Sequence, residues 1–372
     1  MSLPDGRILA WYGSAVLGLW DGATVSSVLL LEGHRGCVKG ATLVSEGRVL
    51  SWSDDGTLRL WEGLTGRALA TLAGHTGSIS GATLLLDGRI LSWSDDKTIR
   101  LWDGESGALE ATLEGHTNEI AGAMQLSSGR VLSWSGQNCE DACYPIMRSW
   151  DSVTGKPLAT FEGHADSVRG VASLPDGRIL SWSSDATLRL WDECTGSPLA
   201  TFIGHTGAVM GAVLLDDGRL FSWSTDGTLR LWDIATARSI AVFEGHTSMV
   251  SGATLLPDGQ ILSCSRDTTL RVWDGVLPCS TERMDGHTSE IDGAVLCFDG
   301  SVLSWSADMT LRRWDAVTGQ SLARLKGHKG AVSGGVKLAD ARILSWSRDD
   351  GTLRLWDGVT GNLLATLTGH TC

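Results

Sequence analysis

The chain is 372 residues long, carries a formal net charge of −13 at pH 7, and contains 17 tryptophans but only 2 tyrosines and 5 phenylalanines. Such an acidic chain is a poor match for nucleic acid, because phosphate binding needs cations that displace counterions. It has no apolar run of membrane-spanning length, and its first residues lack the basic segment and apolar stretch of a secretion signal. We therefore expect a cytoplasmic protein whose partners are neither nucleic acids nor membranes.

The cysteines give no sign of a disulfide framework. They are Cys37, Cys139, Cys143, Cys194, Cys264, Cys279, Cys297 and Cys372. They do not recur at a regular spacing, as the cysteines of a disulfide framework would. They are therefore typical of thiols in a reducing compartment. Only Cys139 and Cys143 lie close together, and two ligands are weak evidence for a metal. We predict no metal and no cofactor.

One stretch of sequence recurs from end to end. Residues 87–104 are DGRILSWSDDKTIRLWDG, which predicts two short strands joined by a tight turn at Asp95-Asp96. All nine histidines follow a glycine, at spacings of 41, 41, 48, 41, 41, 41, 41 and 42 residues, and nine Trp-Asp or Trp-Glu pairs keep the same step. A period of about 41 residues is typical of four-stranded propeller blades.

Each full repeat predicts four strands, which we name a to d. In the repeat that begins with His75 they are expected at 79–84, 90–94, 98–102 and 108–113, with an Asp-Gly turn between the first two. No segment of useful length has the periodicity of a helix. The sequence therefore predicts an all-β chain.

The repeated Gly-His, Asp-Gly, Ser-x-Ser-x-Asp-x-Thr and Trp-Asp elements resemble the WD-repeat family of β-propellers. The resemblance covers essentially the whole chain and implies that His, the strand-b Ser, the turn Asp and the strand-c Trp of each blade form a hydrogen-bonded tetrad. Such bonds would satisfy a buried imidazole and indole N–H. The implied tetrads are His34, Ser51, Asp55, Trp61; His75, Ser92, Asp96, Trp102; His164, Ser181, Asp185, Trp191; His205, Ser222, Asp226, Trp232; His246, Ser263, Asp267, Trp273; His287, Ser304, Asp308, Trp314; and His328, Ser345, Trp356 with either Asp349 or Asp350.

Strand b departs from the usual family pattern because it carries a tryptophan. These tryptophans are Trp52, Trp93, Trp134, Trp182, Trp223, Trp305 and Trp346. Strand a carries Gly-Ala or a similarly small pair, so we expect each indole to be buried in the space left on the neighbouring strand. The one full repeat without this tryptophan has Cys264, and we expect looser packing there.

The organisation predicted is a single WD-type β-propeller over residues 1–372, a monomeric ring with nine four-stranded blades of which the first is incomplete. The alternative is an eight-bladed ring with residues 1–31 as an extension. The predicted repeats are 1–32 (strands b, c and d only), 33–73, 74–114, 115–162 (with a long b–c connection at 136–147), 163–203, 204–244, 245–285, 286–326 and 327–368, followed by 369–372 as the start of a further repeat.

The histidines all occupy the same scaffold position, and no catalytic set of residues remains. We therefore predict that the protein is not an enzyme but a scaffold that binds other proteins or peptides on the top face of the propeller. One alternative is a propeller enzyme of the quinoprotein dehydrogenase type. Another is a sensor or interaction fragment of a larger multidomain signalling protein.

The predicted binding site follows from variation within a constant framework. The residues three and five positions after each histidine differ between repeats, and in WD-repeat proteins these positions lie near the top rim. We expect Arg169, an exposed pair of Met210 and Met249, and an acidic group of Glu290 and Asp292 to form a partner-binding arc. Glu119 and the long connection, with Cys139, Glu140, Asp141 and Tyr144, are expected beside it.

Overall fold

The regular structure consists of strands. A computed structural model describes residues 3, 7–11, 14–21, 27–44, 47–136, 146–274, 280–338 and 340–367. Within these residues there are 35 strands and no helix, arranged in nine antiparallel sheets. The first sheet has three strands and the other eight have four. The predicted nine-bladed, all-β propeller with an incomplete first blade is confirmed, and the eight-bladed alternative is wrong.

The chain divides into two compact units. The first comprises residues 1–181, 190–199 and 370–372, and the second comprises 182–189 and 200–369. The fifth blade contributes to both units. Its strands are β16 (Val168–Ser173), β17 (Arg178–Ser183), β18 (Leu188–Asp192) and β19 (Pro198–Phe202).

Four further blades belong to the first unit. Their strands are β1 (Ile8–Trp11), β2 (Val16–Trp20) and β3 (Ser27–Glu32); β4 (Val38–Leu43), β5 (Arg48–Ser53), β6 (Thr57–Glu62) and β7 (Ala68–Ala73); β8 (Ile79–Leu84), β9 (Ile90–Ser94), β10 (Ile99–Trp102) and β11 (Leu109–Leu113); and β12 (Ile120–Gln125), β13 (Val131–Ser135), β14 (Met147–Trp150) and β15 (Pro157–Phe161).

Blades 6 to 9 belong to the second unit. Their strands are β20 (Val209–Leu214), β21 (Leu220–Ser224), β22 (Leu229–Asp233) and β23 (Arg238–Phe243); β24 (Val250–Leu255), β25 (Ile261–Ser265), β26 (Leu270–Trp273) and β27 (Ser280–Met284); β28 (Ile291–Leu296), β29 (Ser301–Ser306), β30 (Thr310–Asp315) and β31 (Ser321–Lys326); and β32 (Val332–Lys337), β33 (Ile343–Ser347), β34 (Thr352–Trp356) and β35 (Leu363–Leu367).

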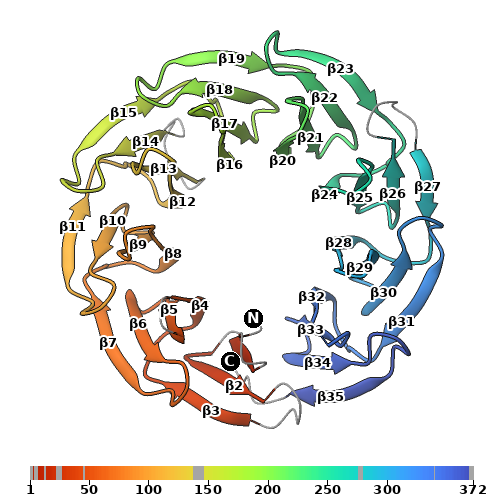
Figure 1. Cartoon of the computed structure of the whole chain (residues 1–372), viewed down its shortest axis with the longest axis horizontal. Coiled ribbons are helices and arrows are strands. Elements are labelled where there is room, and N and C mark those ends of the chain that lie inside the picture. Colours follow the sequence, from red (N-terminus) through yellow and green to blue (C-terminus); the bar gives the residue numbers. More distant parts are fainter. Residues whose placement is uncertain are drawn as a thin grey trace. The chain divides into compact units, whose positions relative to one another are not determined.

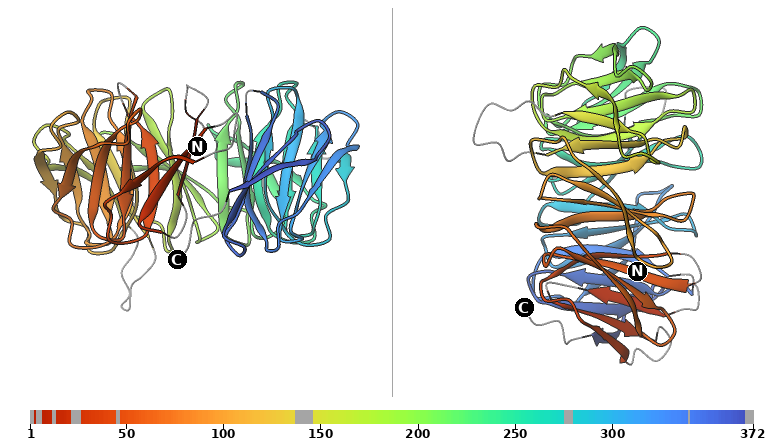
Figure 2. Two further views of the ribbon diagram at one scale, coloured as in Figure 1. Left: turned by 90° about the horizontal axis from the view of Figure 1, so that it is seen from below. Right: turned by 90° about the vertical axis from the view of Figure 1, so that its left-hand side faces the viewer.

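Within each unit, successive blades stand side by side, with strand a on the inner side of the arc and strand d on the outer side (Figure 1). Seen from the side, the strands of each blade run between the same two faces of their unit (Figure 2). We call the edge of a blade that carries the start of strand a and the b–c turn its top face. The opposite edge carries the a–b and c–d turns.

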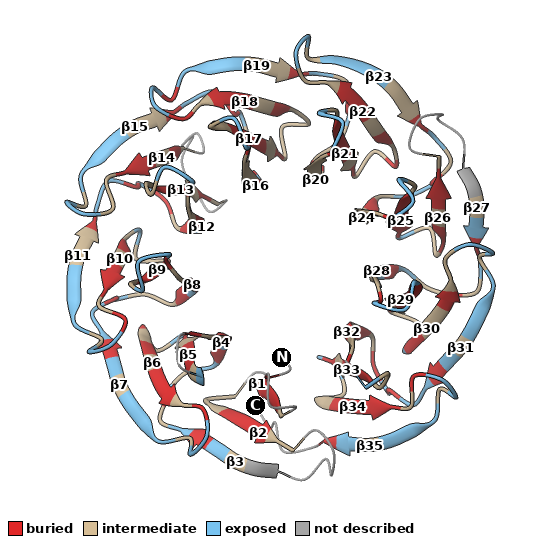
Figure 3. Cartoon of the chain, viewed as in Figure 1, coloured by how far each residue is buried: buried red, intermediate tan, exposed pale blue. Residues whose placement is uncertain are grey.

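The hydrophobic core lies between successive blades. In the second unit, Leu229 and Leu231 of blade 6 pack with Val250, Ile261 and Trp273 of blade 7. The inner parts of strands b and c are buried, whereas much of strand d is exposed (Figure 3). Within each unit, a blade thus buries its apolar side chains against the next blade, which makes the repeats of that unit mutually dependent.

Strand-b tryptophans fill the space above the glycines of strand a. Trp223 of β21 pairs with Gly211 of β20 in the sheet register. A Cβ on Gly211 would lie 2.5 Å from Cε2 of that indole, so no larger residue fits without displacing the ring. The predicted volume exchange is therefore confirmed here. The expectation of full burial is wrong, because Trp223 is half-buried whereas Trp232 of strand c is completely buried.

This difference in burial predicts different costs for removing the two indoles of blade 6. We expect Trp232→Ala to lower the free energy of unfolding by about 4 kcal/mol, because it removes a fully buried side chain and the N–H of the polar network. Trp223→Ala should cost about 2 kcal/mol, since part of its surface is already in water. Urea unfolding of both variants measures the two values, and a larger loss for Trp223→Ala would contradict this assignment of the core.

Candidate binding face

A continuous hydrogen-bond chain supports the top face of each regular blade. In blade 6 the indole Nε1 of Trp232 donates to Ser222 Oγ at 2.8 Å, and Ser222 Oγ lies 2.9 Å from His205 Nε2. His205 Nδ1 lies 2.9 Å from Asp226 Oδ2. Since the Asp226 carboxylate can only accept, Nδ1 is the donor to it; in the neutral imidazole Nε2 then accepts from the serine hydroxyl, whose oxygen accepts from the indole N–H. The chain fixes one tautomer.

The same three contacts occur in five more blades, with Ser to His distances of 2.7–2.8 Å. Their members are His34, Ser51, Asp55, Trp61; His75, Ser92, Asp96, Trp102; His246, Ser263, Asp267, Trp273; His287, Ser304, Asp308, Trp314; and His328, Ser345, Asp350, Trp356. In blade 9 the acceptor is Asp350, whereas Asp349 accepts from the backbone N–H of Ala331 at 3.0 Å. In blade 5, Ser181 contacts His164 Nε2 at 2.8 Å and accepts from Trp191 Nε1 at 2.8 Å.

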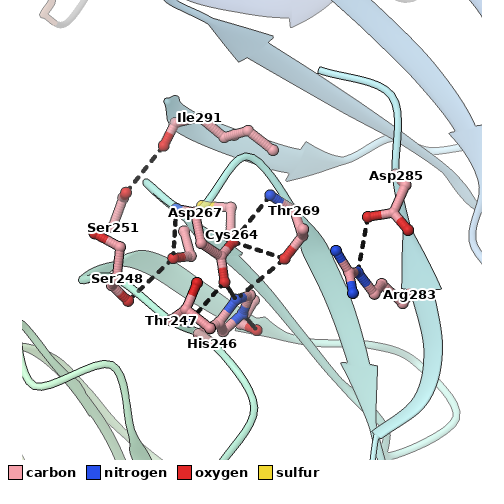
Figure 4. A network of polar contacts seen from close by, with 12 residues as sticks. His246, Thr247, Ser248, Ser251, Cys264, Asp267, Thr269, Arg283, Asp285 and Ile291 are labelled. Carbon is pink, nitrogen blue, oxygen red and sulfur yellow. Dashed lines mark hydrogen bonds and ion pairs between the residues drawn. The ribbon is translucent and has the colours of Figure 1, made fainter. Parts of the chain in front are cut away.

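A threonine two residues after the aspartate is a fifth member that the sequence analysis missed. Thr98 donates from its hydroxyl and its backbone N–H to Asp96 Oδ1, at 2.7 and 2.9 Å, and the Thr76 N–H donates to Oδ2 at 2.9 Å. Burial acts to raise the pKa of Asp96, but these donors together with His75 lower it to about 2. The recurrence of Asp-x-Thr in the repeat was the available signal. Figure 4 shows the same arrangement in blade 7, around His246, Asp267 and Thr269.

Blade 4 departs from this pattern. His116 Nε2 lies 2.7 Å from Ser133 Oγ, which accepts from Trp150 Nε1 at 2.8 Å. No carboxylate among the described residues contacts His116, and residues 137–145 of the b–c connection lie outside them. Burial, and then the nearby positive charge of Arg148, lower the pKa of His116 to about 4. This imidazole is therefore neutral at pH 7.

The residue five positions after the histidine occupies a special place in strand a. In seven blades the pairing of strands a and b shifts register across that residue, as between Val209 and Gly211 on either side of Met210. Such an irregularity redirects a side chain out of the regular ladder. The seven residues are Lys39, Ser80, Ala121, Met210, Ser251, Asp292 and Ser333. The same backbone feature therefore presents lysine, alanine, methionine or aspartate in four of these blades and serine in the other three.

Variable residues three and five positions after the histidine bond to neighbouring blades. Ser78 donates to Asp54 of the preceding blade at 2.6 Å, and Arg266 Nε lies 3.3 Å from Glu290 Oε2 of the following blade. Ser251 donates to the carbonyl of Ile291 at 2.9 Å (Figure 4). Sequence variation at these positions therefore accompanies changing contacts between blades, which the repeat comparison alone did not reveal.

The predicted partner-binding residues are distributed over both units. In the first unit, Arg169 is exposed on β16 and Glu119 is half-buried beside the start of β12. In the second, Glu290 and Asp292 are exposed, and burial together with the charge of Glu290 raises the pKa of Asp292.

The expected exposure of the methionine pair is wrong, since Met210 and Met249 are half-buried. The predicted contributions of Cys139, Glu140, Asp141 and Tyr144 lie outside the described residues.

The described residues also bear on metal binding and on membrane insertion. Among the described side chains, no group of three or more His, Cys, Asp or Glu residues is arranged to hold a metal ion. The described part of the chain also lacks any helix long and apolar enough to cross a membrane.

These sheets and their polar chains define a β-propeller built from WD-type blades. A family model described as "WD domain, G-beta repeat" matches residues 25–62, 66–103, 155–192, 196–233 and 237–274. These matches cover half of the chain, and the protein therefore belongs to the WD40 repeat family. No curated protein matches the sequence.

The fold is shared with a solved structure. The crystal structure of the computationally designed Ika8 protein is 28% identical over 88% of this chain and 98% of that one, with a TM-score of 0.66. The WD40 beta propeller domain of Doa1 is 25% identical over 82% of this chain and 97% of that one, with a TM-score of 0.49.

Removing the turn aspartate should destabilise a blade without removing apolar surface. We expect Asp226→Ala to lower the free energy of unfolding by about 3 kcal/mol, because His205 Nδ1, two backbone N–H groups and the Thr228 hydroxyl lose a charged acceptor. Asp216→Ala, an exposed a–b turn change in the same blade, is the control and should cost less than about 0.5 kcal/mol. Urea titrations in which the two variants are equally stable would show that the polar chain is dispensable.

The lowered pKa of His116 predicts that the folded protein loses stability in acid. Its pKa is 6.5 in the unfolded chain and about 4 in the folded protein, so between these values the unfolded state binds the proton more tightly. Stability should therefore fall as the pH is lowered from about 6.5 to 4, and this histidine should contribute up to about 3 kcal/mol of the loss. His116→Gln should flatten the profile of unfolding free energy against pH, and identical slopes for variant and wild type would refute the assignment.

Proposed function

We propose that the protein is a non-catalytic scaffold that binds another protein or a peptide on the top face of its blades. The observation that carries the proposal is the repeated register shift in strand a, which presents five kinds of side chain in seven blades while the framework beneath stays the same. A surface that varies over a constant scaffold is suited to specific recognition.

The second unit offers the better defined part of this surface. Met210 and Met249 are half-exposed thioethers on blades 6 and 7, and flexible methionine side chains adapt to apolar groups of a partner. Glu290 and Asp292 on blade 8 add negative charge next to them in the chain order. We therefore propose a partner segment that carries an apolar side chain near a basic one.

The ion pair between Arg266 and Glu290 can be replaced by an ion pair with a partner. Arg266 and Glu290 are 46% and 49% exposed, and pairs in such surroundings contribute little to stability because water screens them. Asp292 has a raised pKa, so its carboxylate is poorly stabilised by its present neighbours. A cationic group of a partner would stabilise both acids, which gives charge complementarity a role in the rate and specificity of binding.

We further propose that the protein acts as a monomer in the cytoplasm. The chain is acidic, and Cys194, Cys264 and Cys297 are free thiols, as is usual in a reducing compartment.

Charge reversal on the top face tests the proposal. We expect Glu290→Lys with Asp292→Lys to abolish capture of any protein that the wild-type chain retains from a cell extract, because the acidic group is inverted. Both side chains are exposed, so the melting temperature should change little.

The matched control is Asp216→Lys with Asp258→Lys, which makes the same change of charge on exposed a–b turns at the opposite edge of blades 6 and 7. This variant should retain the partner. Loss of the partner in both variants would indicate a non-specific charge effect, and retention in both would place the binding site elsewhere; either result overturns the proposal.

A further inference from the structure

Blade 7 differs from its neighbours at one central position. Its strand b carries Cys264 where the other full blades carry a tryptophan. Cys264 pairs with Gly252 of β24 in the same register in which Trp223 pairs with Gly211 in blade 6. The backbone that accommodates an indole is therefore retained in blade 7, although the side chain is small.

A pocket occupies the corresponding space. It has a volume of about 150 Å³ and is bordered by Cys264 and Gly252 of blade 7, by Trp223 of blade 6 and by Gly293 and Trp305 of blade 8. A Cβ on Gly252 would contact only Cys264 Sγ, at 3.4 Å. The glycine positions show the same difference in exposure: the equivalents in blades 2 to 6 and 9 are buried, whereas Gly252 and Gly293 are half-exposed.

The walls of this pocket are predominantly apolar. Ala253, Leu262 and Ala294 complete the lining together with Thr254, and none of the lining side chains carries a formal charge. The Cys264 thiol donates to the Gly252 carbonyl at 3.6 Å. Burial raises the pKa of this thiol to about 12, so it stays protonated and does not act as a nucleophile at neutral pH. The chemistry of the walls therefore favours reversible binding of an uncharged ligand.

We propose that this pocket binds one small, uncharged aromatic molecule of the size of indole or a single benzene ring. The ligand would lie between Trp223 and Trp305 and cover Gly252, as the indole of Trp223 covers Gly211 within blade 6. Apolar protein cavities of about this volume hold a benzene ring. Aromatic neighbours add favourable ring contacts to the burial of apolar surface. This site is separate from the proposed protein-binding function and needs no protein partner.

Indole is the probe for the first experiment, with the full-length chain in isothermal titration calorimetry. We expect one indole bound per chain and a melting temperature that rises with indole concentration, since a ligand that binds only the folded state stabilises it. A wild-type chain that neither binds indole nor gains thermal stability from it would overturn the proposal.

Two substitutions locate the bound probe. Cys264→Trp should fill the pocket with an indole of the chain itself and abolish binding, whereas Cys264→Ala keeps the space and should retain it. Indole binding that persists unchanged in Cys264→Trp would overturn the assignment to this pocket. Loss of binding in both variants would also overturn it, because the alanine variant removes only the thiol.

A gain-of-site variant gives a matched control in the first unit. Trp93→Cys in blade 3 reproduces the side chain of blade 7 above Gly81, whose Cβ would otherwise meet the Trp93 ring. We expect the indole stoichiometry to double. If this variant is unfolded by circular dichroism, the Cys264 pair alone decides the outcome.

A tryptophan-containing peptide tests whether the pocket binds a free small molecule or an aromatic side chain of another protein. Free indole and a short peptide containing one tryptophan are titrated in parallel. Tighter binding of free indole supports a small-molecule site. Binding of the peptide without binding of indole would overturn the proposal, because the pocket would then receive the side chain of a partner protein.

Discussion

The structure depends on one serine hydroxyl in each four-stranded blade. In blade 6, Ser222 Oγ accepts from the Trp232 indole and contacts the His205 imidazole, so a single buried atom couples strand c to the connection that precedes strand a. All three groups are buried, and each would be costly without its partner. The carboxylate of Asp226 completes the chain and also holds the b–c turn through Thr228. Core and top face are therefore parts of one hydrogen-bonded system.

This coupling explains why the top face can vary. The turn is fixed from below by the aspartate and from the side by a serine such as Ser224, whose hydroxyl accepts from the Asp226 N–H at 3.1 Å. The residue at the register shift of strand a takes no part in this chain. It can consequently be a lysine, a methionine or an aspartate without loss of the framework, as Lys39, Met210 and Asp292 show.

Much of the fold could be predicted because the same pattern of glycine, histidine, aspartate and tryptophan recurs in every full repeat. The nine Trp-Asp or Trp-Glu pairs predict nine blades, with eight as the alternative, and Gly211 opposite Trp223 predicts the volume exchange. The burial of that tryptophan could not be predicted, because it depends on how far the ring extends beyond the neighbouring blade. The pairing of Arg266 with Glu290 was equally inaccessible, since it joins the b–c turn of one blade to strand a of the next. Contacts within a repeat follow from its sequence, whereas contacts between repeats need the geometry.

The exceptional blades are the informative ones for the same reason. His116 precedes the longest b–c connection and Cys264 replaces a tryptophan, and the described framework around each keeps its regular bonds. Around His116 the serine and indole remain bonded, so the imidazole is held in place and burial lowers its pKa. Around Cys264 the neighbouring indoles remain positioned by their own blades, so the missing ring becomes a pocket. In a repeat architecture the intact neighbours preserve the shape of a local loss, and a substitution in one blade can thereby create a site that no other blade has.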